Sequence, residues 1–330
     1  MHPQLRVIGE ILRAAVPDLM ALGPDRLNAV QERVMVGRWS SLVTRARTVE
    51  TPREDGSRLR LLVVEARRGS RRGSDPRTGL LWIHGGGYAI GAPEQDRSFL
   101  DLLLADGGTL AVLPYYRRSV EAPYPAALEG CRLALAWLHA YAPELGVDPA
   151  RIAVAGESAG GGLAASLCLS ERDRARAGED FLPIAFQMPL YPMLDDRETS
   201  SSRDNDAPVW SSAANRTAWA LHLRGLPAGA EPPALAAPAR TTDYSDLPPT
   251  LTYVGTIEPF HEETLAYCAA LRAAGVPVLV REYEGCFHAF DMIAPWSAPA
   301  RAARAFLRAG FLGARERFRA PAPASRRSAS

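Results

Sequence analysis

Three short motifs in this chain of 330 residues carry groups that could perform nucleophilic chemistry. In chain order they are His84-Gly85-Gly86-Gly87, Gly156-Glu157-Ser158-Ala159-Gly160 and Phe287-His288. The pattern Gly-x-Ser-x-Gly alone is weak, because average composition produces it by chance about 0.1 times in a chain of this length. The three motifs in this order predict attack by Ser158 on an acyl group, beside a glycine loop that binds the oxyanion.

The residues around Ser158 have the pattern that such a nucleophile requires. An apolar strand-like run, 152–155, precedes the motif, and a helix-forming run, 159–167, follows it. Glycines at 156 and 160 let the strand and the helix approach without a Cβ collision, and the tight turn exposes the serine hydroxyl. A helix-capping serine is the alternative. A phosphate-binding loop is disfavoured, because neither Gly-x-Gly-x-x-Gly nor the Walker pattern is present.

A serine hydroxyl needs a base, and histidine has a suitable pKa near neutrality. His288 stands beyond the last predicted strand, in a loop that can reach Ser158 over the end of the sheet. The other five histidines lie in the N-terminal segment, in helical runs, at the start of the glycine loop or after the candidate acid: His2, His139, His222, His84 and His261. We therefore predict His288 as the base, with a buried structural histidine as the alternative.

The base needs a carboxylate that fixes its tautomer and stabilises the imidazolium. Glu258 follows a predicted strand and precedes a helix. The chain order serine, acid, histidine is that of α/β-hydrolases and differs from the chymotrypsin and subtilisin orders. Glu262 and Glu263 are rivals, and we interpret them as carboxylates of a first helical turn.

Backbone N–H groups must stabilise the oxygen of a tetrahedral intermediate. Gly85, Gly86 and Gly87 follow the strand-like run 80–83 and can present such groups without an obstructing Cβ. The N–H of Ala159, directly after the nucleophile, is a further donor. A simple glycine hinge would explain neither the preceding histidine nor the following tyrosine.

Composition argues against several other functions. Acidic and basic residues nearly balance at a formal net charge of +1, so no nucleic acid or anionic membrane partner is predicted. The chain has no lysine, which excludes a Schiff-base mechanism. No His-Glu-x-x-His, clustered Cys/His or Asp-rich loop appears, so we predict no metal and no cofactor. The expected partner is a small-molecule substrate.

The cysteines and the N-terminal segment indicate the cellular compartment of the protein. The four cysteines are widely separated, which fits reduced thiols: Cys131, Cys168, Cys268 and Cys286. Apolar residues recur at helical spacing from Leu5 to Leu19, but Glu10, Arg13 and Asp18 interrupt them. This pattern predicts an amphipathic helix and not a signal peptide or a membrane span. We expect a cytoplasmic protein without stable membrane association.

Short β-rich runs alternate with longer helical stretches, which predicts an α/β fold with a mostly parallel central sheet flanked by helices. The predicted strands are 59–64, 80–83, 110–114, 152–155, 184–188, 251–254 and 276–283. We expect no strand before the low fifties. The predicted organisation is an N-terminal helical cap segment at 1–45, a catalytic domain at 46–194 and 241–312, a cap insertion at 195–240 with a helix around 213–223, and a flexible tail at 313–330.

These motifs, taken together, closely resemble those of hormone-sensitive-lipase-like carboxylesterases, bacterial family IV of the α/β-hydrolase fold. The likeness runs from about Leu80 to Asp291. Beyond the three motifs above it includes Tyr116-Arg117, the run 122–129, Asp206-Ala207-Pro208, the run 247–250 and the run 285–290. The resemblance implies a helical cap built from the N-terminus and the insertion.

The resemblance also implies a role for each site residue. Ser158 would be the nucleophile, His288 the base and Glu258 the acid, while the oxyanion donors would be the N–H groups of Gly86, Gly87 and Ala159. Two positions depart from the family pattern. The family usually has Asp where Glu258 stands, and Asp or Thr where Glu157 stands.

The predicted function is hydrolysis of short- to medium-chain acyl esters through a covalent acyl-enzyme. Candidate substrate-binding aromatics are Tyr88, Tyr191, Trp210 and Phe287, each of which could instead pack in the core or cap. A non-catalytic small-molecule binder on the same fold is an alternative, disfavoured by the presence of serine, histidine and acid together. An acyltransferase or lactonase could use the same triad. A homodimer is possible, since dimers are common in the resembling family.

Overall fold

A single sheet organises the residues that the computed structural model describes, which are 1–16, 18–67 and 75–321. Within these ranges eight strands lie in the order β1-β2-β4-β3-β5-β6-β7-β8. Their bounds are β1 Thr44–Pro52, β2 Arg58–Ala66, β3 Arg77–Ile83, β4 Thr109–Pro114, β5 Val147–Glu157, β6 Gln187–Leu190, β7 Thr250–Gly255 and β8 Val278–Tyr283. Strands β1 and β2 pair antiparallel, as do β2 and β4, and all the other pairs are parallel.

Parallel pairing brings the loops that follow several strands to one edge of the sheet. Strand β3 pairs with β5 so that Ile83 lies opposite Gly156, and β7 pairs with β8 so that Gly255 lies opposite Tyr283. The glycine loop after β3, the serine turn after β5, and the loops after β7 and β8 therefore meet. Crevices at the carboxyl ends of parallel strands are the usual ligand sites of open α/β sheets.

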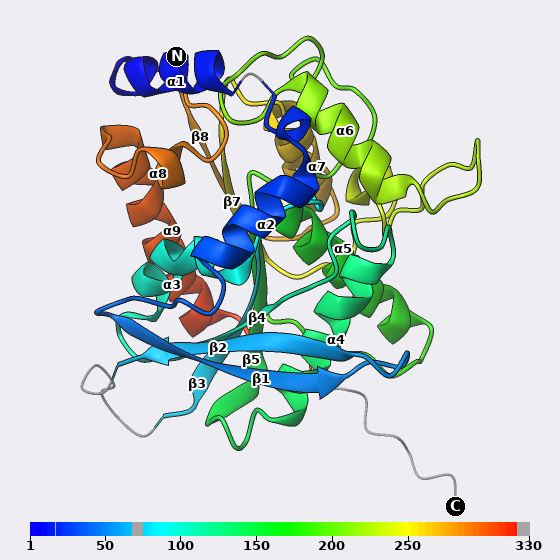
Figure 1. Cartoon of the computed structure of the whole chain (residues 1–330). Helices are drawn as coiled ribbons and strands as arrows, with labels where there is room; N and C mark the ends of the chain where they lie inside the picture. The colour runs from blue at the N-terminus through cyan, green and yellow to red at the C-terminus, as the bar shows by residue number, and fades with distance from the viewer. Residues whose placement is uncertain (17, 68–74, 322–330) are drawn as a thin grey trace, which may run out of the picture.

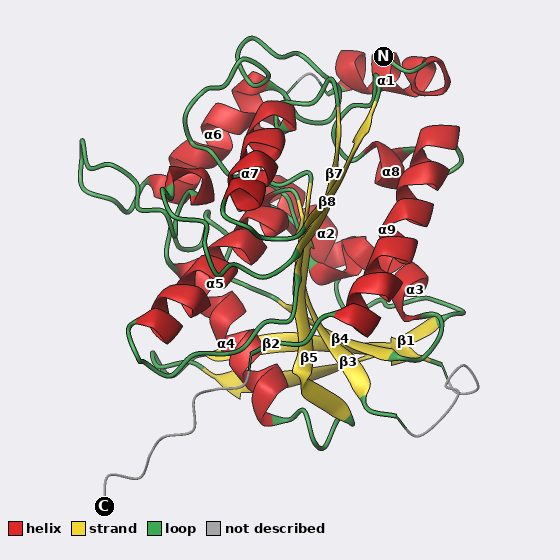
Figure 2. Ribbon diagram, turned by 180° about the vertical axis from the view of Figure 1, so that it is seen from behind, coloured by secondary structure: helices red, strands yellow, loops and turns green. Residues whose placement is uncertain are grey.

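Helices cover both faces of the sheet (Figures 1 and 2). The helices are α1 Pro3–Ala15, α2 Pro24–Val34, α3 Arg97–Leu104, α4 Ala126–Ala140, α5 Ala159–Arg176, α6 Ser212–Leu223, α7 His261–Ala273, α8 Phe290–Ile293 and α9 Ala298–Arg317. Short 3₁₀ helices lie at Met20–Leu22, Pro93–Asp96 and Pro238–Arg240. Figure 2 views the sheet nearly edge-on, with α4, α5, α6 and α7 on one side and α3, α8 and α9 on the other.

The burial of each element follows its hydrophobic pattern. Every residue of the central strands β4 and β7 is buried, as expected for strands covered on both faces. Helix α9 buries Ala303, Leu307 and Phe311, which recur every four residues on one side of the helix. One apolar cluster lies between the sheet and α4, α5 and α7, and a second lies between the sheet and α1, α3 and α9.

Helices α1, α2 and α6 lie over the carboxyl edge of the sheet (Figure 1). Helix α2 is tied to the glycine loop, because the side-chain amide of Asn28 donates to the carbonyl of Ala89 at 3.0 Å. Helix α1 contacts the insertion through an ion pair of 3.1 Å between Arg13 and Asp206. The N-terminal helices and the predicted insertion thus lie beside the site that the motifs define.

Each of the predicted strands overlaps an observed one, with shifted ends, but β1 contradicts the prediction that no strand precedes the low fifties. It begins at Thr44, inside the segment predicted as helical. It is an edge strand with many exposed side chains, so it lacks the apolar run used to recognise strands. Its backbone pairs antiparallel with β2 from Thr44 to Pro52, and the ion pairs Arg45–Glu65 and Arg58–Glu50, at 2.9 and 2.7 Å, join side chains of the two strands.

The C-terminal boundary also differs from the sequence prediction. Helix α9 continues to Arg317, five residues beyond the predicted end of the catalytic domain at 312, because Ala314 is buried and Arg315 pairs with Asp106 at 2.6 Å. The rest of the predicted tail, beyond Pro321, lies outside the described residues. All four cysteines are free and buried. None of the described helices is long and apolar enough to cross a membrane.

Candidate functional site

Ser158 occupies a strained turn between β5 and α5. Its φ is 57° and its ψ is −122°, a conformation that non-glycine residues rarely adopt. A Cβ on Gly160 would lie 2.6 Å from the carbonyl oxygen of His84, and one on Gly156 would lie 2.5 Å from the carbonyl oxygen of Ile83. Both positions therefore require glycine, and the sharp turn raises the serine side chain at the end of the sheet.

A chain of hydrogen bonds joins the three predicted side chains. Because a carboxylate only accepts, His288 Nδ1–H donates to Glu258 Oε2, which leaves Nε2 to accept from the Ser158 hydroxyl at 2.9 Å. The second oxygen of Glu258 accepts from the N–H of Gly255 at 2.7 Å. The serine and the histidine are only 2% and 3% exposed, and the glutamate is fully buried. The 2.9 Å between His288 Nε2 and the Ser158 oxygen suits proton transfer, and the 2.7 Å bond from the Gly255 N–H orients the carboxylate of Glu258.

Glu262 and Glu263, the alternative candidates for the acid, make other contacts. Glu262 accepts from Ser200, and Glu263 is buried and accepts from the N–H of Leu194. Neither carboxylate bonds to His288. Their positions at the start of α7 agree with the predicted first-turn role.

In the part of the chain that the structure describes, none of the other histidines hydrogen-bonds to the Ser158 hydroxyl. His261 pairs with Glu282. The pKa of three others is lowered by burial to about 4, which keeps their imidazoles neutral at physiological pH: His84, His139 and His222.

The predicted oxyanion donors lie in the two segments that flank the serine. Among the described residues, the N–H groups of Gly86 and Gly87 donate to no other group. The loop folds back so that the Gly86 carbonyl accepts from Ala89 and Ile90 at 3.1 and 3.0 Å. Ala159 is the first residue of α5, where a backbone N–H has no partner within the helix. All three N–H groups are therefore available to a negatively charged oxygen.

Aromatic rings enclose the imidazole of His288. Tyr191 and Phe260 meet it edge-on, each with ring centroids 5.0 Å apart, and Trp210 lies 6.3 Å away. Sequence reasoning proposed Tyr191 and Trp210 but missed Phe260. The signal for Phe260 was its place two residues after Glu258, at the start of the helix that follows the acid.

The other two predicted substrate-binding aromatics have packing partners of their own. Tyr88 stacks on His222 of α6 with ring centroids 4.0 Å apart, and its hydroxyl donates to the carbonyl of Met193 at 2.8 Å. Phe287 is fully buried and lies in the apolar cluster that includes α1. These contacts join the core to the helices above it.

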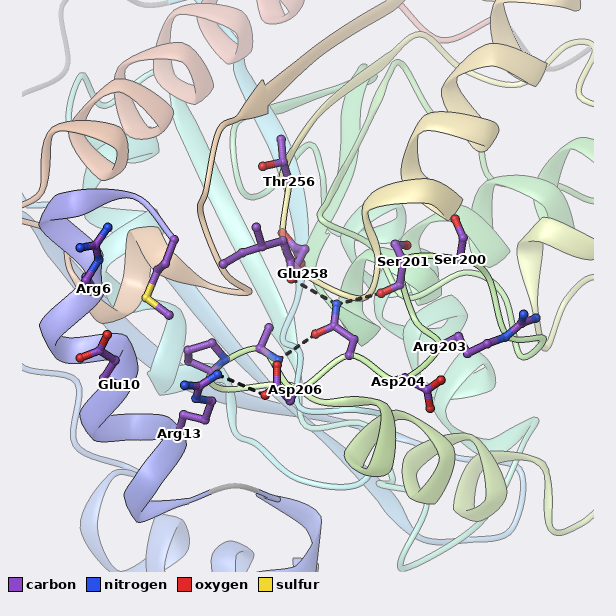
Figure 3. A pocket seen from close by; sticks show the side chains of 15 residues that line it. Arg6, Glu10, Arg13, Ser200, Ser201, Arg203, Asp204, Asp206, Thr256 and Glu258 are labelled. Atoms are coloured by element: carbon purple, nitrogen blue, oxygen red, sulfur yellow. Dashed lines mark hydrogen bonds and ion pairs between the residues drawn. The ribbon is translucent and has the colours of Figure 1, made fainter.

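A pocket of about 620 Å³ lies beside the acid (Figure 3). Arg6, Glu10 and Arg13 of α1 line one side, and residues 200–208 line the other, with Glu258 between them. Neither Ser158 nor His288 lines this pocket. This pocket therefore lies beside the acid and apart from the serine, while the rings of Tyr191, Trp210 and Phe260 surround the imidazole of His288.

No group of three or more potential metal-binding side chains occurs in the part of the chain that the structure describes. The fold is that of an α/β hydrolase, and the hydrogen-bonded serine, histidine and carboxylate lie at its carboxyl edge in the chain order expected for such a fold. A family model described as alpha/beta hydrolase fold matches residues 80–292, and the chain belongs to this family. The fold predicted from the sequence is confirmed.

Curated relatives carry esterase names. Esterase LipI of Mycobacterium tuberculosis is 33% identical over 213 residues, which cover 64% of this chain and 65% of LipI. Carboxylesterase NlhH of the same species is 32% identical over 67% of this chain and 70% of its own length. An acetyl-hydrolase of Streptomyces hygroscopicus is 36% identical over 226 residues, 67% of this chain and 70% of that protein.

Solved structures of esterases are similar to this chain over more of its length than the curated relatives are. A bacterial heroin esterase superposes with a TM-score of 0.80 and 32% identity, covering 92% of this chain and 96% of that one. A hyperthermophilic esterase from the archaeon Pyrobaculum calidifontis gives a TM-score of 0.78 at 27% identity, covering 95% and 98%. The chain thus falls among the carboxylic ester hydrolases of the hormone-sensitive-lipase-like branch, as its motifs indicated.

The close approach at the serine turn makes a stability prediction. Gly160→Ala places a Cβ against the backbone of Ile83 and His84, so we expect a loss of about 1–3 kcal/mol in the free energy of unfolding. Gly313→Ala in α9 is the matched control, because nothing lies within 4 Å of its added Cβ; it should be neutral or stabilising by up to about 1 kcal/mol. Chemical denaturation measures both, and equal effects would contradict the close packing.

Proposed function

We propose that this protein is a serine carboxylesterase that hydrolyses short- to medium-chain acyl esters. The observation that carries the proposal is the hydrogen-bonded chain from Ser158 through His288 to Glu258, buried at the carboxyl edge of the sheet. The names of the relatives, which include carboxylesterase and acetyl-hydrolase, support the same reaction class.

In the proposed mechanism the Ser158 oxygen attacks the ester carbonyl while His288 Nε2 takes its proton. Glu258 holds the Nδ1–H tautomer and stabilises the imidazolium that forms. The carbonyl oxygen becomes an oxyanion, which accepts hydrogen bonds from the N–H groups of Gly86, Gly87 and Ala159. Collapse of this intermediate releases the alcohol with a proton from His288 and leaves the acyl group on the serine. Water, deprotonated by His288, then attacks the acyl-enzyme, and collapse of the second tetrahedral intermediate breaks the acyl–serine bond, releases the carboxylic acid and returns the proton from His288 to Ser158.

The surroundings of the serine support small acyl groups. Trp210 packs on the glycine loop so closely that a Cβ on Gly87 would lie 2.8 Å from its Cζ2 atom. Tyr191 and Phe260 close off other sides of the imidazole. We propose these three aromatics as walls of the acyl site, and we propose α1, α2 and residues 195–240 as the cap above it. Tyr88 and Phe287 then support this cap from beneath.

A second function would use the same residues. An acyltransferase or lactonase differs from an esterase only in the acceptor or ring that the cap admits, and the relatives favour hydrolysis by their names. A non-catalytic binder is disfavoured, because the serine, the base and the acid are all present and mutually bonded.

The first test is turnover of p-nitrophenyl acetate, butyrate, octanoate and palmitate at pH 7 to 8. We expect rates to fall with chain length and Ser158→Ala to reduce kcat by about 10⁴-fold or more, because the acyl-enzyme cannot form. A folded wild-type protein without turnover would argue against the proposal for these substrates. Adding an alcohol acceptor and analysing the products distinguishes transfer from hydrolysis.

The choice of acid is tested by comparing two carboxylates. Glu258→Gln should lower kcat by about 10³- to 10⁴-fold, because an amide facing Nδ1 favours the wrong imidazole tautomer. Glu262→Gln is the control, since that exposed carboxylate bonds to Ser200 and should leave kcat within about threefold. Steady-state kinetics on p-nitrophenyl butyrate decides between them, and the reverse pattern would transfer the role to Glu262.

A further inference from the structure

Glu157 joins the two segments that would form the oxyanion site. Its Oε1 accepts from the N–H of Gly85 at 2.5 Å and from the side-chain amide of Gln95 at 3.0 Å. The residue is only 4% exposed. A Cβ on Gly85 would lie 2.6 Å from the carboxyl carbon of Glu157, so the glycine loop packs directly on this side chain.

Strand pairing within the sheet holds the backbone of Glu157 in place. It is the last residue of β5, where it lies opposite Leu190 of β6, and it directly precedes Ser158. The loop that it holds follows β3, a different strand. The bond to Gly85 therefore sets the distance between the glycine loop and the serine turn.

The bond acts close to the predicted donor groups. Glu157 fixes the peptide unit that carries the Gly85 N–H. The next peptide unit, which joins Gly85 to Gly86, is held by its carbonyl, which accepts from His84 Nδ1 at 2.8 Å. That second unit carries the Gly86 N–H, which is free to bind an oxyanion. Two consecutive peptide units are thus oriented by side chains, one from the loop itself and one from the nucleophile turn.

We infer that Glu157 is a positioning residue for the proposed reaction: as an acceptor for the Gly85 N–H it aligns the oxyanion loop with Ser158. It does not contact the reacting atoms and acts through the backbone of the loop. The inference rests on the proposed function and adds a residue outside the triad to its machinery.

The surroundings indicate that an acceptor, and not a negative charge, is what this position requires. Both groups that Oε1 contacts are donors, and the neutral amide oxygen of a glutamine can accept from the same donors. The ionisable groups that interact with Glu157 electrostatically include His288, the fully buried Asp96 and Asp291, and the buried tyrosines Tyr116 and Tyr191. Burial raises the pKa of Glu157, with the nearby imidazole acting in the opposite direction.

A pair of variants tests the inference. Glu157→Gln keeps an acceptor oxygen for Gly85, whereas Glu157→Met has a similar size and no acceptor. For each variant we would measure kcat and KM on p-nitrophenyl butyrate and the inhibition constant of an alkyl trifluoromethyl ketone. That ketone forms a tetrahedral oxyanion with an active serine and so reports on the oxyanion site. Amide hydrogen exchange of the segment 84–91 reports on the loop without any turnover.

For Glu157→Met we expect kcat to fall about 10- to 100-fold, somewhat less than the loss of a whole oxyanion donor, with KM within threefold. The inhibition constant should rise by a similar factor and the segment 84–91 should exchange faster. Glu157→Gln should stay within about threefold of the wild type in all four quantities.

Two results would overturn the inference. Unchanged exchange and kcat in Glu157→Met would show that the bond does not position the loop. A loss in Glu157→Gln as large as in Glu157→Met would show that the charge matters instead. If Glu157→Met does not fold, Glu157→Gln still decides by retaining or losing kcat and loop protection. Absence of turnover in the wild type would refute the proposed function, whereas the exchange measurement would still test the contact.

Discussion

The sharp turn at Ser158 is the constraint on which the site depends. The chain passes from β5 to α5 through a residue with φ of 57°, and it can do so only because the glycines on either side have no Cβ to meet the backbone of Ile83 and His84. The turn brings β5, α5 and the loop after β3 within contact of one another. Every other group in the site is aligned to the position that this turn gives the serine oxygen.

The sheet supplies the remaining groups through its parallel pairing. Glu258 follows β7 and His288 follows β8, so neighbouring strands place the proposed acid and the proposed base at the same edge as the serine. The Gly255 N–H orients the carboxylate, which in turn orients the imidazole. Because serine, histidine and acid are nearly inaccessible to solvent, their hydrogen bonds are stronger than they would be in water. The fold therefore holds these three hydrogen-bonded side chains in position before any substrate binds.

The sequence predicted the features that short motifs and local patterns encode. The serine turn is local, since it needs a strand, a helix and two glycines within nine residues of one another, and the acid and base follow recognisable strands. Contacts between distant segments were harder to predict. Phe260 touches His288 across 28 positions of the chain, and the partner of Glu157 is a backbone N–H 72 positions away. The exposed edge strand β1 carries no apolar run, and the end of α9 depends on a distant aspartate.

Covalent labelling is the sharpest test of the proposed role of Ser158 as a nucleophile activated by His288. A p-nitrophenyl alkylphosphonate reacts with an activated serine and releases one p-nitrophenolate. We expect one label per chain by intact mass, located on Ser158 by peptide mapping, and none on Ser158→Ala under the same conditions. A label on another residue, equal labelling of Ser158→Ala, or no reaction with the folded wild-type protein would contradict the account.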